Sequence, residues 1–243
     1  MDKIEQLRKI IENSSSIVFF GGAGVSTESH IPDFRSDTGL YKRKYPYLAE
    51  QMLSHSFYVK HPKEFFDFYF NEMIYEDAVP NKAHLALTKL EKQGKLKAIV
   101  TQNIDGLHQK AGSVNVLELH GSVMRNYCTQ CKKSFTLDET IQLRDKDGIP
   151  RCDNDQAIIK PDVVLYEEGL DQHIIYEAVN AISHADTLIV GGTSLVVYPA
   201  AGLIQYFQGK NLVLINKEST PMDSQATLVI HDSIGKVLDE AVK

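Results

Sequence analysis

Short apolar runs, rich in β-branched residues, recur along the chain and are separated by segments in which apolar residues repeat at helical spacing. Runs of this length without polar alternation are typical of strands buried on both faces of a sheet. The predicted strands lie at 17–20, 97–100, 116–119, 163–166, 187–190, 212–215 and 227–230, and the predicted helices at 81–93, 171–183 and 199–207. Strands that alternate with helices predict an α/β fold with a doubly wound parallel sheet.

The amino-terminal segment is charged throughout, and Ile4, Leu7, Ile10 and Ile11 recur at helical spacing. This pattern predicts an amphipathic helix rather than a secretory signal. No apolar run approaches the roughly 20 residues that span a bilayer. We therefore expect a cytoplasmic protein without membrane association, in a compartment that keeps thiols reduced.

Two stretches interrupt the alternation of strands and helices. The segment 36–79 is rich in aromatic residues and predicts loops and helices, and the segment 123–159 holds all three cysteines. Within the second, Thr136 and Glu139 have the spacing of a capping box, which predicts a helix start. We expect one domain, 1–243, in which these two stretches form a smaller lobe and the remainder, 1–35, 80–122 and 160–243, forms a larger one.

The composition argues against some partners and against a disulfide framework, but it does not indicate a function. The hydrophobic fraction of 43% and the charged fraction of 24% are ordinary for globular proteins. The formal net charge of −6 argues against nucleic acid or anionic membranes as partners, because an acidic surface recovers no counterion-release energy. Three cysteines, an odd number, argue against a disulfide framework and direct attention to metal binding.

A glycine turn, 21–24, follows the first predicted strand and precedes a predicted helix start. Such a turn lets backbone N–H groups approach a pyrophosphate, and the helix terminus adds partial positive charge. Thr27 stands where the dinucleotide fingerprint has its third glycine, so a plain glycine turn is the competing interpretation. Further on, Arg35 is suited to pair with a phosphate and Phe34 to cover a ring or a reactive sugar face.

Polar side chains follow two other predicted strands. The sequence TQNIDGLH, at 101–108, comes directly after the strand 97–100, and His120 comes directly after the strand 116–119. The carboxyl ends of parallel strands are where doubly wound proteins bind ligands. A lone histidine is more often structural, but this one ends a strand that borders the predicted pocket.

Together these segments resemble the sirtuins, the NAD-dependent protein-lysine deacylases, and in particular bacterial deacetylases. The matching motifs are GAGVSTES at 22–29, IPDFRS at 31–36, TQNIDGLH at 101–108, ELHGS at 118–122, KPDVVLYEE at 160–168 and GTSLVVYPAAGL at 192–203. The resemblance covers nearly the whole chain. It implies a Rossmann-like large lobe and a smaller lobe made of a helical insertion and a zinc ribbon, with NAD and an acyl-lysine peptide entering the cleft between them from opposite sides.

The resemblance also implies the chemistry. In sirtuins the acyl oxygen of the substrate lysine displaces nicotinamide, so the protein supplies orientation, charge stabilisation and one general base. His120 is expected to be that base and to accept a proton from a ribose hydroxyl, because an imidazole titrates near neutral pH. Asn103 is expected to orient the ribose and a water molecule. The expected products are nicotinamide, deacylated lysine and O-acyl-ADP-ribose.

Other positions are assigned to ligands on the same resemblance. Contacts with NAD are expected from Ala23, Thr27, Phe34, Arg35, Gln102, Ile104, Asp105, His120, Thr193, Ser194, Asn216, Asp232 and Ile234. The substrate peptide is expected to add itself as a strand between the segments 163–169 and 195–198, with Val163, Leu195 and Val196 at the contact. Because this pairing uses the backbone, we expect loose sequence specificity.

The acyl group is partly predictable. Family members that prefer succinyl or malonyl lysine carry a tyrosine and an arginine in the helical insertion. No arginine lies between Lys44 and Met124. This favours acetyl or another uncharged acyl group.

Two positions depart from the family pattern. Cys128, Cys131, Cys152 and Asp155 have the spacing of a four-ligand zinc ribbon, with aspartate where sirtuins have cysteine. Since zinc accepts a carboxylate oxygen, we expect a structural zinc ion here, with a weakened or empty site as the alternative. His30 stands where the family has glycine, and a positive φ there would strain a histidine beside the cofactor loop.

Other functions stay open on the sequence. A mono-ADP-ribosyltransferase would use the same cofactor site and pass ADP-ribose to a protein, although Asn103, Asp105 and His120 favour deacylation. A non-catalytic zinc-ribbon module that binds protein or DNA is a second alternative, and the net acidity argues against DNA. A nicotinamide dehydrogenase comes third because its fingerprint is incomplete.

Overall fold

The computed structural model describes residues 2–36 and 39–243. Its larger sheet has the strand order β3-β2-β1-β7-β8-β9, and every neighbouring pair is parallel. The strands are β1 (Ile17–Gly21), β2 (Leu96–Thr101), β3 (Val116–Glu118), β7 (Thr187–Gly191), β8 (Asn211–Ile215) and β9 (Leu228–Ile230). All the predicted strands except 163–166 therefore lie in this sheet.

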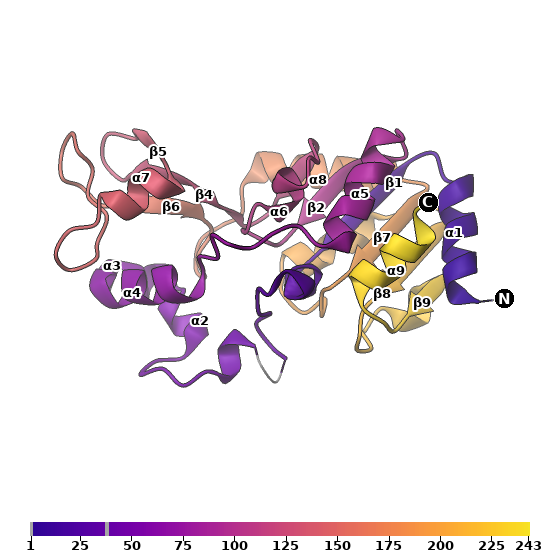
Figure 1. The fold of residues 1–243 in the computed structure, drawn as a ribbon, viewed down its shortest axis with the longest axis horizontal. Coiled ribbons are helices and arrows are strands. Elements are labelled where there is room, and N and C mark those ends of the chain that lie inside the picture. The colour runs from indigo at the N-terminus through magenta and orange to yellow at the C-terminus, as the bar shows by residue number, and fades with distance from the viewer. Residues whose placement is uncertain (1, 37–38) are drawn as a thin grey trace.

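Helices cover both faces of the larger sheet (Figure 1). On one face lie α1 (Lys3–Asn13), α5 (Lys82–Lys92) and α9 (Ile234–Ala241), which share a core with Ile17 and Phe19 of β1. On the other face, α8 (Gln172–Ser183) and the 3₁₀ helix Ala200–Tyr206 share a core with Val18 and Phe20. This two-sided burial explains why the strands lack polar alternation, and it confirms the doubly wound α/β prediction. The predicted helix 199–207 is a 3₁₀ helix rather than an α-helix.

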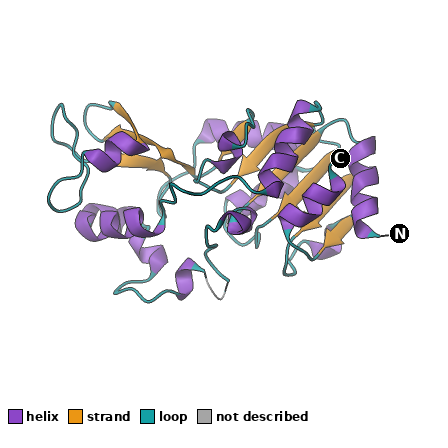
Figure 2. Ribbon diagram, in the orientation of Figure 1, coloured by secondary structure: helices purple, strands orange, loops and turns teal. Residues whose placement is uncertain are grey.

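A smaller antiparallel sheet forms the other end of the molecule (Figure 2). Its strand order is β5-β4-β6, with β4 at Gly121–Cys128, β5 at Ser134–Thr136 and β6 at Ile159–Val163. The helices of this end are α2 (Ala49–Met52), α3 (His55–Lys60), α4 (Pro62–Glu72) and α7 (Leu137–Gln142). Aromatic residues of α4 share a core with Val123 of β4 and Val163 of β6, so the helical insertion rests on the small sheet.

Two local predictions for the helices are confirmed. At the start of α7 the Thr136 side chain accepts the Glu139 N–H, and the Glu139 carboxylate accepts the Thr136 N–H, as a capping box requires. At the amino terminus, α1 buries Leu7 and Ile11 against the sheet. None of the helices in 2–36 and 39–243 is long and apolar enough to cross a bilayer.

The predicted parallel strand at 163–166 is wrong. The strand of this region is β6, Ile159–Val163, which pairs antiparallel with β4 at an edge of the small sheet. Its burial alternates, with Ile159, Pro161 and Val163 buried and the residues between them partly exposed. A proline within a run favours an edge strand, and this signal outweighs the short apolar run that follows it. The lobe boundaries drawn from the sequence stay a prediction.

Candidate active site and metal site

A cleft of about 1200 Å³ lies at the carboxyl ends of β1, β2, β7 and β8. Residues of the small sheet, among them Val123 of β4 and Val163 of β6, complete its wall. The cleft is thus at the edge of the parallel sheet where a doubly wound fold brings its loops together. Its size is sufficient for a dinucleotide and a side chain of a second ligand, since small-molecule sites occupy about 300–1000 Å³.

The glycine turn forms a tight contact between two loops rather than an α-helix start. After β1 the chain makes two short 3₁₀ turns, Ala23–Val25 and Thr27–Ser29, so the predicted helix dipole is not provided there. The Gly24 N–H donates to the Gly192 carbonyl at 2.8 Å, and a Cβ on Gly24 would lie 2.8 Å from the Gly192 Cα. Glycine is therefore required for the loops after β1 and β7 to meet and to present backbone N–H groups to the cleft.

His30, which stands where the family has glycine, adopts the left-handed backbone conformation. Its φ is 64° and its ψ is 19°, and it ends the second 3₁₀ turn. For a residue with a side chain this conformation costs about 1–2 kcal/mol. The strain lies directly beside the cleft, next to Ile31, which lines it.

A hydrogen-bonded group of three side chains connects the loops after β1 and β2. The Ser26 hydroxyl donates to Asp105 Oδ2 at 2.6 Å, and Asn103 Nδ2 donates to the Ser26 Oγ at 3.1 Å. Burial raises the pKa of Asp105, although the Ser26 hydroxyl and the Leu107 N–H oppose the shift. A buried carboxyl that faces a cleft needs donors, and the amide of a ligand can supply them.

His120 is held in one orientation by the backbone. Its Nδ1 donates to the Gln102 carbonyl at 2.9 Å, which leaves Nε2 as the acceptor. Burial lowers the pKa of His120, and the bond to the Gln102 carbonyl opposes the shift only in part. The imidazole is therefore neutral at pH 7 and suited to accept a proton at Nε2.

A second polar group extends the cleft across β7 and β8. Gln102 Nε2 donates to the Thr193 hydroxyl at 3.1 Å, and the Thr193 N–H donates to Asn216 Oδ1 at 2.9 Å. Asn216 Nδ2 is buried without a partner among the described residues. A buried unpaired donor is costly unless a ligand satisfies it, so this amide marks a polar ligand position.

The cysteine cluster provides four donors in one place. Sγ of Cys128, Cys131 and Cys152 and a carboxylate oxygen of Asp155 lie within 4.8 Å of one another. The Cys131 and Cys152 sulfurs are 3.7 Å apart, and Cys128 Sγ is 3.3 Å from Asp155 Oδ1. Ligands at 2.0–2.3 Å from a tetrahedral zinc ion have such separations, so the donor set fits zinc with aspartate in the fourth place.

A model of the Sir2 family matches residues 22–199. The chain belongs to the Sir2 family. This agrees with the sirtuin resemblance inferred from the motifs. The match extends from the glycine turn through the cysteine cluster to the loop after β7.

Relatives of known name cover the same length. The NAD-dependent protein deacetylase of Clostridium acetobutylicum is 64% identical over 244 residues, covering 100% of this chain and 99% of the relative. That of Staphylococcus aureus strain COL is 48% identical over 237 residues, covering 97% of this chain and 96% of the relative.

Solved Sir2 structures have the same fold. One, with a deacetylated p53 peptide and 3′-O-acetyl ADP-ribose, has a TM-score of 0.92, 37% identity and full coverage of both chains. Another, with a p53 peptide and NAD⁺, has a TM-score of 0.85 and 39% identity, and the match covers 98% of this chain and 96% of that one. The Rossmann-like fold predicted from the sequence is thereby confirmed.

In this sirtuin the cleft gathers most of the residues that the sequence singled out. Those that line it are Ala23, Thr27, Phe34, Arg35, Gln102, Asn103, Ile104, Asp105, His120, Val163, Thr193, Ser194, Asn216, Asp232 and Ile234. Two others lie elsewhere. Leu195 is buried in the core on the α8 face of the sheet, and Val196 is half-exposed. Both line a small separate hollow with Met222.

Sequence reasoning missed several residues of the sirtuin cleft. Ser26, which joins Asn103 to Asp105, carried no separate signal because a serine after a glycine turn is common. Tyr41 also lines the cleft, where its ring packs 5.5 Å from that of Phe34. Such aromatic residues cannot be distinguished from core residues by sequence pattern alone.

Proposed function

We propose that this protein is an NAD-dependent protein-lysine deacetylase. The observation that carries the proposal is a cleft of a Sir2-family fold in which His120, Asn103 and Asp105 come together. When bound, NAD supplies an electron-poor ribose carbon whose leaving group is nicotinamide. The chain's own residues would bind NAD and the acyl-lysine and orient them, and one residue would accept a proton.

We propose that His120 is the general base and Asn103 the group that orients the ribose. The bond from His120 Nδ1 to the Gln102 carbonyl supports this role, because it fixes the tautomer whose Nε2 accepts a proton. Asn103 lies within hydrogen-bonding reach of Ser26, which supports an oriented amide in the same part of the cleft.

The remaining cleft residues are proposed as the NAD site. Asp105 and Ile104 would hold the nicotinamide carboxamide, with Asp105 as the acceptor. Arg35, Thr27, Ala23 and Phe34 would contact the pyrophosphate and the nearby ribose, whereas Gln102 also lines the sugar site. A second set, near the adenosine end, would comprise Thr193, Ser194, Asn216, Asp232 and Ile234. The unpaired Asn216 amide supports a polar ligand at that end.

We propose that the substrate peptide lies beside β6. Because β6 is an edge strand of the small sheet, the backbone of 163–169 is suited to strand addition, with 195–198 on the other side. An uncharged acyl group is favoured. Arg125, which lines the cleft, already donates to Glu118 and Asp162 and is thus not free to pair with an acyl carboxylate.

We also propose a structural zinc ion at the cysteine cluster and a cytosolic location. The four clustered donors support the first proposal. The odd number of cysteines supports the second, since it argues against the disulfide framework of a secreted protein.

One assay tests the proposal. The protein is incubated with NAD labelled in the adenosine and with a peptide containing one acetyl-lysine, and the products are followed by mass spectrometry. We expect nicotinamide, deacetylated peptide and O-acetyl-ADP-ribose in equal amounts. Stable labelling of protein without O-acetyl-ADP-ribose would instead indicate a mono-ADP-ribosyltransferase, and absence of NAD turnover would contradict both.

A further inference from the structure

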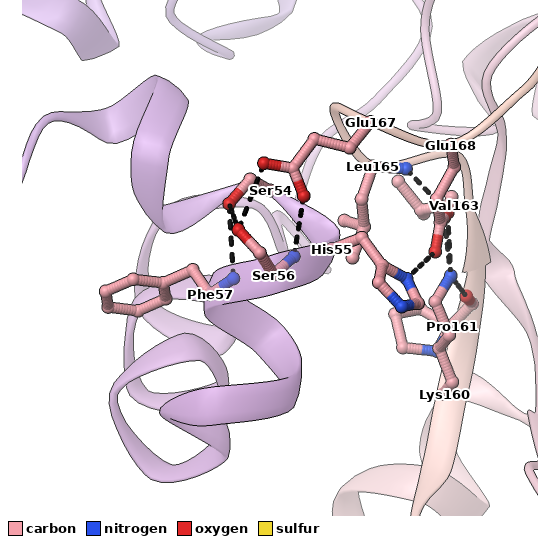
Figure 3. Close-up of polar contacts among 10 residues, drawn as sticks. All are labelled: Ser54, His55, Ser56, Phe57, Lys160, Pro161, Val163, Leu165, Glu167 and Glu168. Atoms are coloured by element: carbon pink, nitrogen blue, oxygen red, sulfur yellow. Dashed lines mark hydrogen bonds and ion pairs between the residues drawn. The ribbon is translucent and has the colours of Figure 1, made fainter.

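Two adjacent glutamates join the segment after β6 to helix α3 (Figure 3). Glu167 accepts the Ser56 N–H at 2.8 Å and the Ser56 hydroxyl at 3.0 Å. Glu168 accepts His55 Nδ1 at 2.8 Å and Lys160 Nζ at 3.2 Å. We refer to Glu167 and Glu168 as the acidic pair. Its contacts reach from the edge of the cleft to the helical insertion.

The backbone of Glu167 is strained. Its φ of 76° lies in the left-handed region, which costs about 1–2 kcal/mol for a residue with a side chain. Strain of this kind persists where neighbouring contacts enforce it, and such positions cluster at functional sites. Here the Glu167 side chain makes two such contacts, the hydrogen bonds to Ser56 in the first turn of α3.

Glu168 is bound more deeply than its partner. Its side chain is 22% exposed and also accepts the Leu165 N–H at 2.9 Å. Burial raises the pKa of Glu168, but the Leu165 N–H, His55 and Lys160 together outweigh it and hold this pKa below its usual range. The carboxylate is therefore ionised at neutral pH, and it closes a turn of the segment 165–168.

The same segment is anchored at its other end to the residue proposed as the general base. The Val164 N–H donates to the His120 carbonyl at 3.0 Å. Further along, the Tyr166 N–H donates to the Leu53 carbonyl, and the Tyr166 carbonyl accepts the His55 N–H, each at 3.0 Å. The segment 164–166 is thus held between His120 and α3, and it lines the cleft beside Val163.

We propose that the acidic pair positions the peptide-binding segment 163–166 relative to His120, and that Glu167 and Glu168 are positioning residues for the acyl-lysine peptide. This inference rests on the proposed function. It gives the helical insertion a role in peptide binding. This role is separate from the contacts with NAD. Loss of the pair therefore weakens peptide binding, whereas NAD binding and proton transfer stay intact.

Glu167→Gly separates the two effects of this residue. Glycine removes the carboxylate bonds to α3 and at the same time relieves the positive φ. If the backbone conformation were all that mattered, this variant would bind peptide as well as the wild type or better. The proposed role predicts the opposite, a KM for the acetyl-lysine peptide about tenfold higher with the kcat and the KM for NAD within about twofold of wild type.

Two further variants keep the result interpretable. Glu167→Gln retains an acceptor for Ser56, so its peptide KM is expected between those of wild type and Glu167→Gly. Glu240→Gln, at an exposed position of the carboxyl-terminal helix α9, is the control for loss of one negative charge and is expected to match wild type. Equal KM values for peptide in Glu167→Gly and Glu240→Gln would overturn the inference, as would a fall in kcat with peptide KM unchanged.

A direct measurement of peptide binding distinguishes failure of this inference from failure of the proposed function. The anisotropy of a fluorescein-labelled acetyl-lysine peptide is titrated with each full-length protein. We expect about tenfold weaker binding by Glu167→Gly. Wild type that binds the peptide but does not deacetylate it would contradict the proposed function alone. Unchanged binding by Glu167→Gly would contradict the positioning role alone, and wild type that binds no peptide would contradict both.

Discussion

The two ends of the molecule position their polar side chains by different means. At the edge of the large sheet, His120 and Thr193 each lie two residues after a strand, β3 or β7, and are held by neighbouring loops. In the small lobe, Cys152 and Asp155 meet Cys128 only because segments far apart in the chain fold back together. We therefore expect that side chains at the sheet edge can be changed without loss of the fold, whereas those of the cysteine cluster are needed for the fold of the small lobe.

The largest expected effect is on chemistry at the sheet edge. His120→Ala should lower the rate of deacetylation by about 10²–10⁴-fold, because it removes the proposed general base. The melting temperature should stay within about 4 °C of wild type, since the imidazole faces the cleft. Steady-state kinetics and calorimetry measure the two quantities. His173→Ala, exposed on α8, is the control, and unfolding of His120→Ala would contradict the separation of site from fold.

In the small lobe we expect substitution to lower the stability of the protein. Cys152→Ser removes a buried thiolate from the cluster, so bound zinc should be lost and the melting temperature should fall by about 10 °C or more. Zinc is measured by elemental analysis of the purified protein. Asp155→Cys is the matched variant and should retain zinc more firmly against a chelator, because a thiolate replaces the carboxylate. Wild-type stability in Cys152→Ser would show that the cluster is not a metal site.

Stability of the large lobe should depend on pH rather than on metal. His84 and His108 are buried side by side, with ring centroids 4.7 Å apart. Burial lowers the pKa of His84 to about 4 and, helped by repulsion from His84, lowers the pKa of His108 to about 3. In the unfolded chain both titrate near 6.5, so below that pH the unfolded state binds more protons and the folded state is disfavoured.

The free energy of unfolding should therefore fall as the pH drops from about 6.5 toward 4, by up to about 1.4 kcal/mol per pH unit for each histidine. His108→Asn should make this dependence shallower by about one proton. Urea unfolding at a series of pH values measures the slope. His173→Asn should leave the slope unchanged, and an equally steep slope in His108→Asn would contradict the assignment.

The sheet edge is easier to predict from the sequence than contacts between segments that lie far apart in the chain. Strand ends at the large sheet can be located from apolar runs, and strand topology places 101–108 and His120 at the pocket. The other cleft residues are assigned on the family resemblance. The strand at 163–166 was misplaced, because an apolar run does not specify which sheet it joins. After β1 the sequence predicts a helix start where the structure has two 3₁₀ turns, because the turn type depends on the approach of Gly192, which lies far along the chain.

Side-chain contacts between residues far apart in the chain cannot be predicted from the sequence pattern. The pairing of Glu167 with Ser56 and the position of Ser26 between Asn103 and Asp105 join segments with no common local pattern. In contrast, the capping box of α7 was predictable because both partners lie within one turn. Local hydrogen bonds leave a signature in the sequence, whereas long-range side-chain contacts do not.

The smallest expected effect concerns His30, whose backbone is strained at the end of the second 3₁₀ turn after β1. His30→Gly should raise the free energy of unfolding by about 0.5 kcal/mol, because relief of the φ of 64° is partly offset by the greater freedom of glycine in the unfolded chain. Chemical unfolding measures the change. His30→Ala keeps a Cβ and so should give no gain. If alanine stabilised the protein as much as glycine, the imidazole ring rather than the backbone would be the source of the strain.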